Sequence, residues 1–329
     1  MRANATYSIT KAAPLWAAFF LWVMLPLTGC SDGSQYAYIT NQLSNNVSVI
    51  DLQNRQVKYT IDVGDAPAGV AQSQDGQKVF ISNADSQDIS FIDTTLMQET
   101  DRLKVGDGPV GIASNDDGSV LYVADWYQQQ ISVIDTKDKK IINTIAVGQS
   151  PAGLIVDDAN QILYVANRDG NSVSVVDLTT QQAVAEIAVG KAPFGLALSQ
   201  DGDRLYTVNV QDNSVSVVDT GAQKTIETIA VGEWPYCATL SHDDNTLYVT
   251  NQDENTVSKI DLSSNEVTAV IDVDDTPEGI DISANGRYLY VANWGSGKVS
   301  VIDTKTDKLI ENIATAQGSR AFGNFIAGP

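Results

Sequence analysis

The sequence contains few of the side chains from which metal and haem centres are built. Its 329 residues include one histidine, His242, and two cysteines, Cys30 and Cys237. A histidine cluster, a cysteine-rich metal site and a c-type haem motif each need more such residues, so all three are excluded. Basic residues are also scarce, with 20 lysines and arginines against 41 aspartates and glutamates. An acidic chain of this kind repels phosphate groups and favours cationic partners.

The remaining composition is that of a folded chain rich in turns. Hydrophobic residues make up 43% of the sequence, which is enough to bury a large core, and 24 glycines and 9 prolines provide turns. Apolar residues follow no helical period in the repeated part of the chain, and short strand-like runs occur instead. We therefore exclude disorder as the main state and expect an all-β fold.

The N-terminus has the order of an export signal. Arg2 and Lys11 lie in the first segment, the stretch Leu15–Leu27 is almost wholly apolar, and Cys30 follows closely. A basic segment, an apolar segment and a cleavage site in this order are typical of exported proteins. The apolar stretch of 13 residues is shorter than the ~20 that a membrane-spanning helix needs. We therefore expect this segment to be removed on export.

The four residues that end at Cys30, Leu-Thr-Gly-Cys, resemble the signal of bacterial lipoproteins. The resemblance implies that residues 1–29 are a lipoprotein signal peptide, that Cys30 carries the lipid, and that residues 30–35 form a short tether. In such proteins an aspartate directly after the cysteine causes retention at the inner membrane. Ser31 stands there, which implies the outer membrane, on its periplasmic or its outer side. An ordinary secretory signal that contains a cysteine is the alternative.

A period of 42 residues runs through the rest of the chain. One series of aspartates keeps this interval: Asp51, Asp93, Asp135, Asp177, Asp219, Asp261 and Asp303. A second series consists of Pro67, Pro109, Pro151, Pro193, Pro235 and Pro277. A third series consists of Asn41, Asn83, Asp125, Asn167, Asn209, Asn251 and Asn293. Residues 36–329 hold seven periods without insertion or deletion, which predicts a single domain with no linker.

Within one unit the pattern predicts four short strands. In a representative unit they are Phe194–Ser199, Arg204–Val208, Val215–Asp219 and Thr225–Val231, and an Asp-Gly turn joins the first two. Four antiparallel strands in each 42-residue unit match the blade of a β-propeller. The sequence therefore predicts a seven-bladed β-propeller.

The two ends of the repeated region predict how the ring closes. The first unit begins at residues 36–40, which correspond to a second strand, and the last ends at residues 320–326, which correspond to a first strand. The C-terminal end therefore supplies the innermost strand that the first unit lacks. We expect the C-terminal strand 320–326 to pair with the N-terminal strand 36–40, which removes an exposed sheet edge.

Three units carry a recognisable four-residue sequence. In one unit it reads Tyr-Val-Thr-Asn and ends at Asn251. In two other units it reads Tyr-Val-Ala-Asn and ends at Asn167 and at Asn293. These sequences resemble the signature of the YVTN family of β-propeller repeats. The resemblance covers the whole chain after the signal and implies the propeller fold. The family includes periplasmic and surface propellers, archaeal surface-layer proteins, and domains of denitrification enzymes and amine dehydrogenases, so it implies no single function.

The repeated residues are predicted to be structural. Each carboxylate of the Asp51 series ends a third strand, where it can accept hydrogen bonds from turn N–H groups, and the Asn41 series can do likewise after the second strand. The glycine two residues after a repeated proline, as in Pro193 and Gly195, lets the inner strands converge on the axis. Acid pairs in the first hairpins lack the spacing of a calcium loop and are predicted to be solvated turns. They are Asp116-Asp117, Asp157-Asp158 and Asp243-Asp244.

Functional residues are expected where the units differ. In a propeller the loops between the second and third strands, and those between blades, lie on the same face. Such a face carries seven candidate binding residues: Trp126, Tyr127, Arg168, Phe194, Trp234, Tyr236 and Trp294. Tryptophan, tyrosine and arginine are the usual composition of a recognition surface. The alternative is that each tryptophan only plugs the channel mouth or covers a neighbouring blade.

The remaining cysteine and the histidine are predicted to be inert. Cys237 replaces the glycine that follows the repeated proline, and a buried, unreactive thiol is expected there. His242 lies in an acidic hairpin on the opposite face, and the repeat places no nucleophile beside it, so a Ser-His-Asp arrangement has little support.

These observations favour a non-enzymatic, lipid-anchored binding or scaffold propeller without a cofactor or metal. Its aromatic face would engage a protein, peptide or glycan outside the cytoplasm, either as a monomer or as a subunit of a larger envelope complex. One alternative is an enzyme, of the lyase or lactonase kind or a subunit of a redox complex, with a divalent ion on a channel carboxylate such as Glu278. Another is a protein that binds single-stranded nucleic acid by stacking, which the acidic surface disfavours.

Overall fold

A computed structural model describes residues 1–4, 6 and 36–326. Cys30, the tether and nearly all of the predicted signal peptide lie outside these residues. Within the described ranges no helix is long and apolar enough to cross a membrane. The repeated region forms 27 strands arranged in seven antiparallel sheets, and no helix occurs among its described residues. The prediction of an all-β, seven-bladed propeller is confirmed.

The strands occupy equivalent positions in each blade. The innermost strands are β4 (Pro67–Gln72), β8 (Pro109–Ser114), β12 (Pro151–Asp157), β16 (Pro193–Leu198), β20 (Pro235–Leu240) and β24 (Pro277–Ile282). The second strands are β1 (Tyr36–Asn41), β5 (Lys78–Asn83), β9 (Val120–Asp125), β13 (Ile162–Asn167), β17 (Arg204–Asn209), β21 (Thr246–Asn251) and β25 (Tyr288–Asn293).

The outer half of each blade follows the same order. The third strands are β2 (Asn46–Asp51), β6 (Asp88–Asp93), β10 (Gln130–Asp135), β14 (Ser172–Asp177), β18 (Ser214–Asp219), β22 (Thr256–Asp261) and β26 (Lys298–Asp303). The outermost strands are β3 (Gln56–Asp62), β7 (Gln98–Lys104), β11 (Lys140–Ala146), β15 (Gln182–Ala188), β19 (Lys224–Ala230), β23 (Glu266–Asp272) and β27 (Lys308–Ala314).

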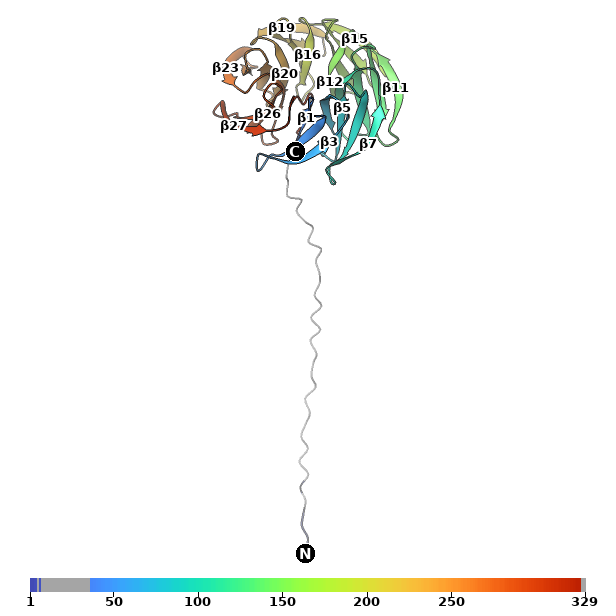
Figure 1. Ribbon diagram of the computed structural model, residues 1–329, viewed down its shortest axis with the longest axis vertical. Coiled ribbons are helices and arrows are strands. Elements are labelled where there is room, and N and C mark those ends of the chain that lie inside the picture. The colour runs from blue at the N-terminus through green and yellow to red at the C-terminus, as the bar shows by residue number, and fades with distance from the viewer. Residues whose placement is uncertain (5, 7–35, 327–329) are drawn as a thin grey trace. The chain divides into compact units, whose positions relative to one another are not determined.

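The blades are numbered here in chain order. Blade 1 contains β1–β3, and blades 2 to 7 begin at β4, β8, β12, β16, β20 and β24. Figure 1 shows the blades following one another around a ring, with β27 near β3. Second and third strands are the most buried, whereas the outermost strands are largely exposed. The apolar core therefore lies between the flat faces of adjacent blades.

The C-terminal segment closes the ring at the predicted place. The N–H of Tyr38 donates to the carbonyl of Phe325 at 2.9 Å, and the N–H of Arg320 donates to the carbonyl of Thr40 at 2.9 Å. Antiparallel bridges join Ala37 to Ile326 near one end of β1 and Asn41 to Ser319 at the other. The pairing of residues 320–326 with residues 36–40 is therefore present.

This segment is not the continuous strand that the sequence predicts. Between the two bridges Phe322 turns to blade 2, where its carbonyl accepts a hydrogen bond from the N–H of Val70 at 2.7 Å. Ala321 and Gly323 have φ angles of 54° and 87°, which lie in the left-handed region and interrupt an extended strand. The C-terminal segment thus contacts both the inner edge of β1 in blade 1 and the innermost strand β4 of blade 2.

The aspartates of the Asp51 series act as predicted. In all seven blades one carboxylate oxygen accepts a hydrogen bond from a backbone N–H two or three residues later, as Asp177 does from Thr179 at 2.8 Å and from Thr180 at 2.9 Å. The glycines of the inner strands also act as predicted. A Cβ on Gly111 would lie 1.7 Å from the carbonyl oxygen of Ala152 on the next blade.

The asparagines of the Asn41 series act differently from the prediction. Their Nδ2 groups donate to side chains of the neighbouring third strand, as Asn209 does to Ser214 at 3.0 Å and to Ser216 at 2.9 Å. Among the seven positions, Asp125 accepts turn N–H groups as expected, from Tyr127 and Gln128. The reason is the amide group, because the buried asparagines can donate from Nδ2 to the serines of the next strand, whereas the equally buried carboxylate of Asp125 can only accept.

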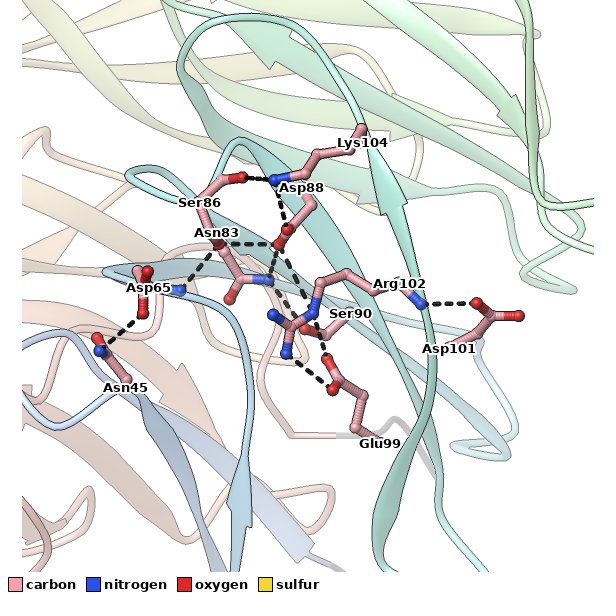
Figure 2. A network of polar contacts seen from close by, with 10 residues as sticks. All are labelled: Asn45, Asp65, Asn83, Ser86, Asp88, Ser90, Glu99, Asp101, Arg102 and Lys104. Atoms are coloured by element: carbon pink, nitrogen blue, oxygen red, sulfur yellow. Dashed lines mark hydrogen bonds and ion pairs between the residues drawn. The ribbon is translucent and has the colours of Figure 1, made fainter.

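Blade 2 carries a buried charge at one of these serine positions. Figure 2 shows Asp88 accepting hydrogen bonds from Asn83 at 3.0 Å and from Ser86 at 2.9 Å. Lys104 and Arg102 lie 3.3 and 3.9 Å from its carboxylate. The outermost strand β7 thus supplies the bases that offset this carboxylate.

Candidate functional site

Two kinds of loop form one face of the propeller, which we call the loop face. They are the loops between second and third strands and the loops between blades. Hydrogen bonds join the two kinds: the N–H of Trp126 donates to Gly108 and the N–H of Gln252 donates to Trp234, both at 3.0 Å. The opposite face, which carries the hairpins between first and second strands, is called the hairpin face. The predicted grouping of the loops is therefore correct.

Two sets of equivalent residues, one from each blade, lie at the loop-face end of the channel. The residues that follow the repeated proline, or its counterpart Ser319, are Ala68, Val110, Ala152, Phe194, Tyr236, Glu278 and Arg320. The residues that follow the second strand are Gln42, Ala84, Trp126, Arg168, Val210, Gln252 and Trp294. In the first set the small side chains of blades 2 to 4 lie on one side of the ring, and the large or charged side chains of blades 5 to 7 and of Arg320 lie on the other, so this end of the channel is asymmetric.

Three aromatic rings meet at this end of the channel. The ring centroids of Phe194 and Tyr236 are 4.3 Å apart, those of Phe194 and Phe322 are 4.9 Å apart, and those of Tyr236 and Phe322 are 5.4 Å apart. Both phenylalanines are buried, and burial raises the pKa of the Tyr236 hydroxyl. We call these three residues the aromatic plug. Phe194 and Tyr236 therefore plug the channel mouth, the role that the sequence analysis considered as the alternative for the tryptophans.

A buried ion pair lies beside the aromatic plug. The guanidinium of Arg320 contacts both carboxylate oxygens of Glu278, and its Nη2 is 2.9 Å from Oε1. Gln252 donates to the same carboxylate at 2.9 Å, and Arg320 also lies over the ring of Phe322. Glu278 is only 4% exposed. Because both of its oxygens are engaged by these donors, this arrangement disfavours the divalent ion that the sequence analysis suggested for Glu278.

Trp126 and Arg168 extend this group of residues toward the surface. The guanidinium of Arg168 lies 5.7 Å from the ring centroid of Trp126, a cation–π arrangement. Trp126 is half-buried and packs against the apolar cluster that contains Phe194 and Phe322. The positive charge of Arg168 also acts on Tyr236. Four of the predicted residues, Trp126, Arg168, Phe194 and Tyr236, are therefore brought together.

The other three predicted residues lie apart from this group. Tyr127 is 72% exposed and Trp234 is 39% exposed. Trp234 also has a φ of 53°, and its N–H donates to Asn213 at 3.1 Å. Trp294 donates through its indole N–H to Gln42 at 2.9 Å, which links blade 7 to blade 1. Trp294 therefore covers the ring closure, and Tyr127 and Trp234 remain as exposed aromatic residues of the loop face.

Sequence reasoning missed Arg320 and Phe322 as members of this site. The repeat phase contained a signal for Arg320, because it is equivalent to Phe194 and Tyr236. Phe322 gave no such signal, since its ring enters the plug through the irregular backbone of residues 321–323.

Beneath the aromatic plug the channel contains a cavity of about 280 Å³. Apolar side chains that include Ile112, Leu196 and Phe322 line its inner part. Polar residues of the hairpin face, among them Gln72 and Asp116, line its mouth. The channel is therefore closed at the loop face and accessible from the hairpin face.

The two residues predicted to be inert have the expected surroundings. Cys237 is buried against the cavity, and burial raises the pKa of its thiol, which disfavours the reactive thiolate. The exposed His242 lies on the hairpin face with Nε2 3.0 Å from the carbonyl oxygen of Ser283. Among the described residues no group of three or more histidine, cysteine, aspartate or glutamate side chains could hold a metal ion.

Two family models each match part of this chain. The model described as the cytochrome D1 heme domain matches residues 203–321, and that described as a YNCE-like beta-propeller matches residues 71–162. The protein is thus a seven-bladed propeller built from sequence repeats. No curated protein matches the sequence significantly.

Solved structures with the same fold include three of different description. Hydrazine synthase of Kuenenia stuttgartiensis is 23% identical with a TM-score of 0.71, over 77% of this chain and 87% of that one. A functionally unknown protein from Desulfotomaculum acetoxidans is 15% identical with a TM-score of 0.78, over 90% and 100%. The dihydro-heme d1 dehydrogenase NirN is 16% identical with a TM-score of 0.65, over 85% and 63%. At these identities the likeness shows the fold alone.

The described residues that line the channel do not fit a haem. No histidine lines the channel cavity, and the thiol of Cys237 is held in its protonated form. Haem iron needs an axial ligand such as histidine, thiolate or tyrosinate. The cavity of about 280 Å³ is also at or below the lower end of the range of about 300–1,000 Å³ for ligand pockets. The match to a haem-domain model therefore reflects the propeller fold.

Proposed function

We propose that this protein is a binding propeller of the bacterial cell envelope, anchored through a lipid on Cys30, that holds a protein partner within a redox-type complex. Two similar structures support the redox setting, since their descriptions are hydrazine synthase and a dihydro-heme d1 dehydrogenase. The sequence before Ser31 supports the anchor, and Ser31 itself favours the outer membrane. Because the described residues that line the channel do not fit a haem, the proposal assigns the redox centre to the partner.

The observation that carries the proposal is the pair of exposed aromatic residues on the loop face. Tyr127 and Trp234 are exposed, by 72% and 39%, whereas Glu278 and Arg320 beside the channel axis are buried and paired. Exposed tyrosine and tryptophan side chains on a rigid support are typical of binding hot spots, because little conformational entropy is lost on binding. The loop face is therefore the surface we assign to the partner.

Binding of nucleic acid is less well supported at this face. Its two central bases are already engaged, because Arg168 lies 3.2 Å from Asp169 and Arg320 is paired with Glu278. A protein that binds single strands without sequence preference combines aromatic residues with a basic groove. The loop face has the first feature without the second.

Purification of the full-length protein from native membranes in mild detergent tests the proposal. We expect a partner to co-elute with the wild type, and we expect the complex to show the visible absorbance of a redox cofactor. Mass spectrometry should show an N-terminal peptide that begins at a lipidated Cys30. The double variant Tyr127→Ala/Trp234→Ala should lose the partner. Its melting temperature should change little, because both side chains are exposed.

Leu96→Ala is the matched control. Leu96 is 61% exposed and lies in the turn between β6 and β7, on the hairpin face. The variant therefore removes an exposed apolar side chain far from the loop face. This variant should keep the partner. Retention of the partner by the double variant would reject the loop face as the binding surface. A partner without a redox cofactor would reject the redox setting.

A further inference from the structure

The channel cavity, which lies beneath the aromatic plug and is accessible from the hairpin face, is an unassigned site. Its inner wall is apolar and includes Ile112, Leu196 and Phe322, whereas its mouth is polar. Such a division, with an apolar interior and a few polar groups at one end, is the usual composition of a small-molecule pocket. A ligand would therefore enter from the hairpin face with its polar end last.

The mouth contains a hydrogen-bond acceptor that lacks a donor. The Nε2 group of Gln72 donates to the carbonyl of Asn324 at 3.1 Å. Its Oε1 is buried and receives no hydrogen bond from the described residues. A buried acceptor without a partner destabilises the folded protein, because it has lost its hydrogen bonds to water without replacement. Because this oxygen is shielded from solvent, the Gln72 amide must turn toward the mouth before the N–H donor of a ligand can reach it, and the new hydrogen bond would then offset that loss.

The charge at the mouth selects among such donors. Asp116 is the charged residue among those that line the cavity, and no lysine or arginine lines it. Among the described residues Asp116 has no salt-bridge partner. Partial burial and the nearby carboxylates of Asp158 and Asp117 raise the pKa of Asp116, because no positive charge offsets them. A cationic donor is therefore favoured over a neutral or anionic one.

The cavity volume sets the size of the apolar part. A protein cavity of about 150 Å³ holds benzene, so the channel cavity of about 280 Å³ has room for a phenyl ring and a short chain. We propose that the channel binds a small amphiphilic amine, with its apolar group against Ile112, Leu196 and Phe322 and its ammonium group between Asp116 and Oε1 of Gln72. This site does not depend on the partner proposed for the loop face.

Isothermal titration of the full-length protein with 2-phenylethylamine tests this proposal. The comparison ligand is 2-phenylethanol, which has the same shape without the charge. At about pH 8 the ammonium and the carboxylate are both charged, and the amine should bind at least about tenfold more tightly than the alcohol, since one charge pair at a partly hydrated mouth is worth that much. Asp116→Asn should abolish this difference and leave binding of the alcohol unchanged.

Two further variants separate the channel from the general negative charge of the chain. Ala113→Phe fills the cavity from a partly exposed wall residue, and it should abolish binding of both ligands. Glu233→Gln removes one negative charge from an exposed position on the loop face, and it should change neither affinity.

Three results would overturn the proposal. They are equal affinities for the amine and the alcohol, an amine affinity that Asp116→Asn leaves intact, and the absence of binding at millimolar amine. A melting curve by circular dichroism checks that Ala113→Phe is folded. If it is not, the pair Asp116→Asn and Glu233→Gln decides the outcome alone, because both positions are exposed.

Discussion

At the scale of single residues, Asp281 is a carboxyl group whose charged form the fold strongly disfavours. It is buried in β24, where burial raises its pKa to about 7. Hydrogen bonds from the N–H groups of Ile326, Ile282 and Phe325, at 2.8, 2.8 and 3.0 Å, and the nearby His242 act in the opposite direction. Two of these donors belong to the C-terminal segment, so Asp281 holds the ring closure at an electrostatic cost.

This cost predicts how stability depends on pH. Between about pH 4 and pH 7 the folded protein keeps a proton on Asp281 that the unfolded chain has lost, so the free energy of unfolding falls as pH rises through this window. Asp281→Asn removes the titration and keeps an acceptor oxygen for the C-terminal segment. We expect it to raise the free energy of unfolding by about 2 kcal/mol at about pH 8 and to change it little at about pH 4. Urea unfolding at the two pH values measures this.

Asp243→Asn is the control with the opposite sign. The hydroxyl of Ser241, at 2.6 Å, and donors from Asn245 lower the pKa of Asp243 to about 2. Its charged form therefore stabilises the fold above the unfolded pKa, and this contribution is lost as pH falls toward 2. We expect Asp243→Asn to destabilise the protein at about pH 8. A shift in the same direction for both variants would contradict the assignment of Asp281.

At the scale of strands, the blades balance charges within themselves. The position of Asp88 is occupied by serine in blades 4 and 5, at Ser172 and Ser214. In blade 2 the aspartate is accompanied by Arg102 and Lys104 on β7. A buried carboxylate is costly unless basic partners such as these, or hydrogen-bond donors, offset its desolvation.

A double-mutant cycle checks this balance. Replacing Arg102 and Lys104 together by methionine leaves Asp88 buried without its bases, and we expect a loss of about 2 kcal/mol in the free energy of unfolding, less than for a fully buried pair because Lys104 is exposed. In an Asp88→Ser background the same double replacement should cost little. Equal losses in both backgrounds, measured by urea unfolding, would show that the bases act independently of Asp88.

The strands themselves could be predicted from the sequence because each depends on local pattern and on the period. The predicted strand Arg204–Val208 is one residue shorter than β17, and Phe194–Ser199 is shifted by one residue from β16. The candidate site could be predicted less completely from local pattern and period. The pairing of Glu278 with Arg320, like the stacking of Phe322, depends on which side chains of adjacent blades meet, and a period fixes only their height along the axis.

At the scale of the whole molecule, the ring is closed by non-covalent contacts between its two ends. The contacts of Tyr38 with Phe325 and of Thr40 with Arg320 hold blade 1 to the C-terminal segment, and the contact of Trp294 with Gln42 holds blade 7 to blade 1. In repeat phase, the position after Pro329 is equivalent to Tyr36, seven periods earlier. The break in the chain therefore falls within a hairpin that is continuous in the other six blades.

This phase predicts that the chain tolerates circular permutation without a linker. Joining Pro329 directly to Tyr36, and opening the chain between the exposed residues Ala159 and Asn160 in the equivalent hairpin of blade 4, should preserve the fold and a similar melting temperature. Deletion of the residues after Gly318 should instead lower the melting temperature and promote aggregation, since it exposes the inner edge of β1. Calorimetry and light scattering distinguish the two variants. A permuted chain that melts as early as the truncated one would mean that the ring depends on a feature of its native ends other than the contacts described here.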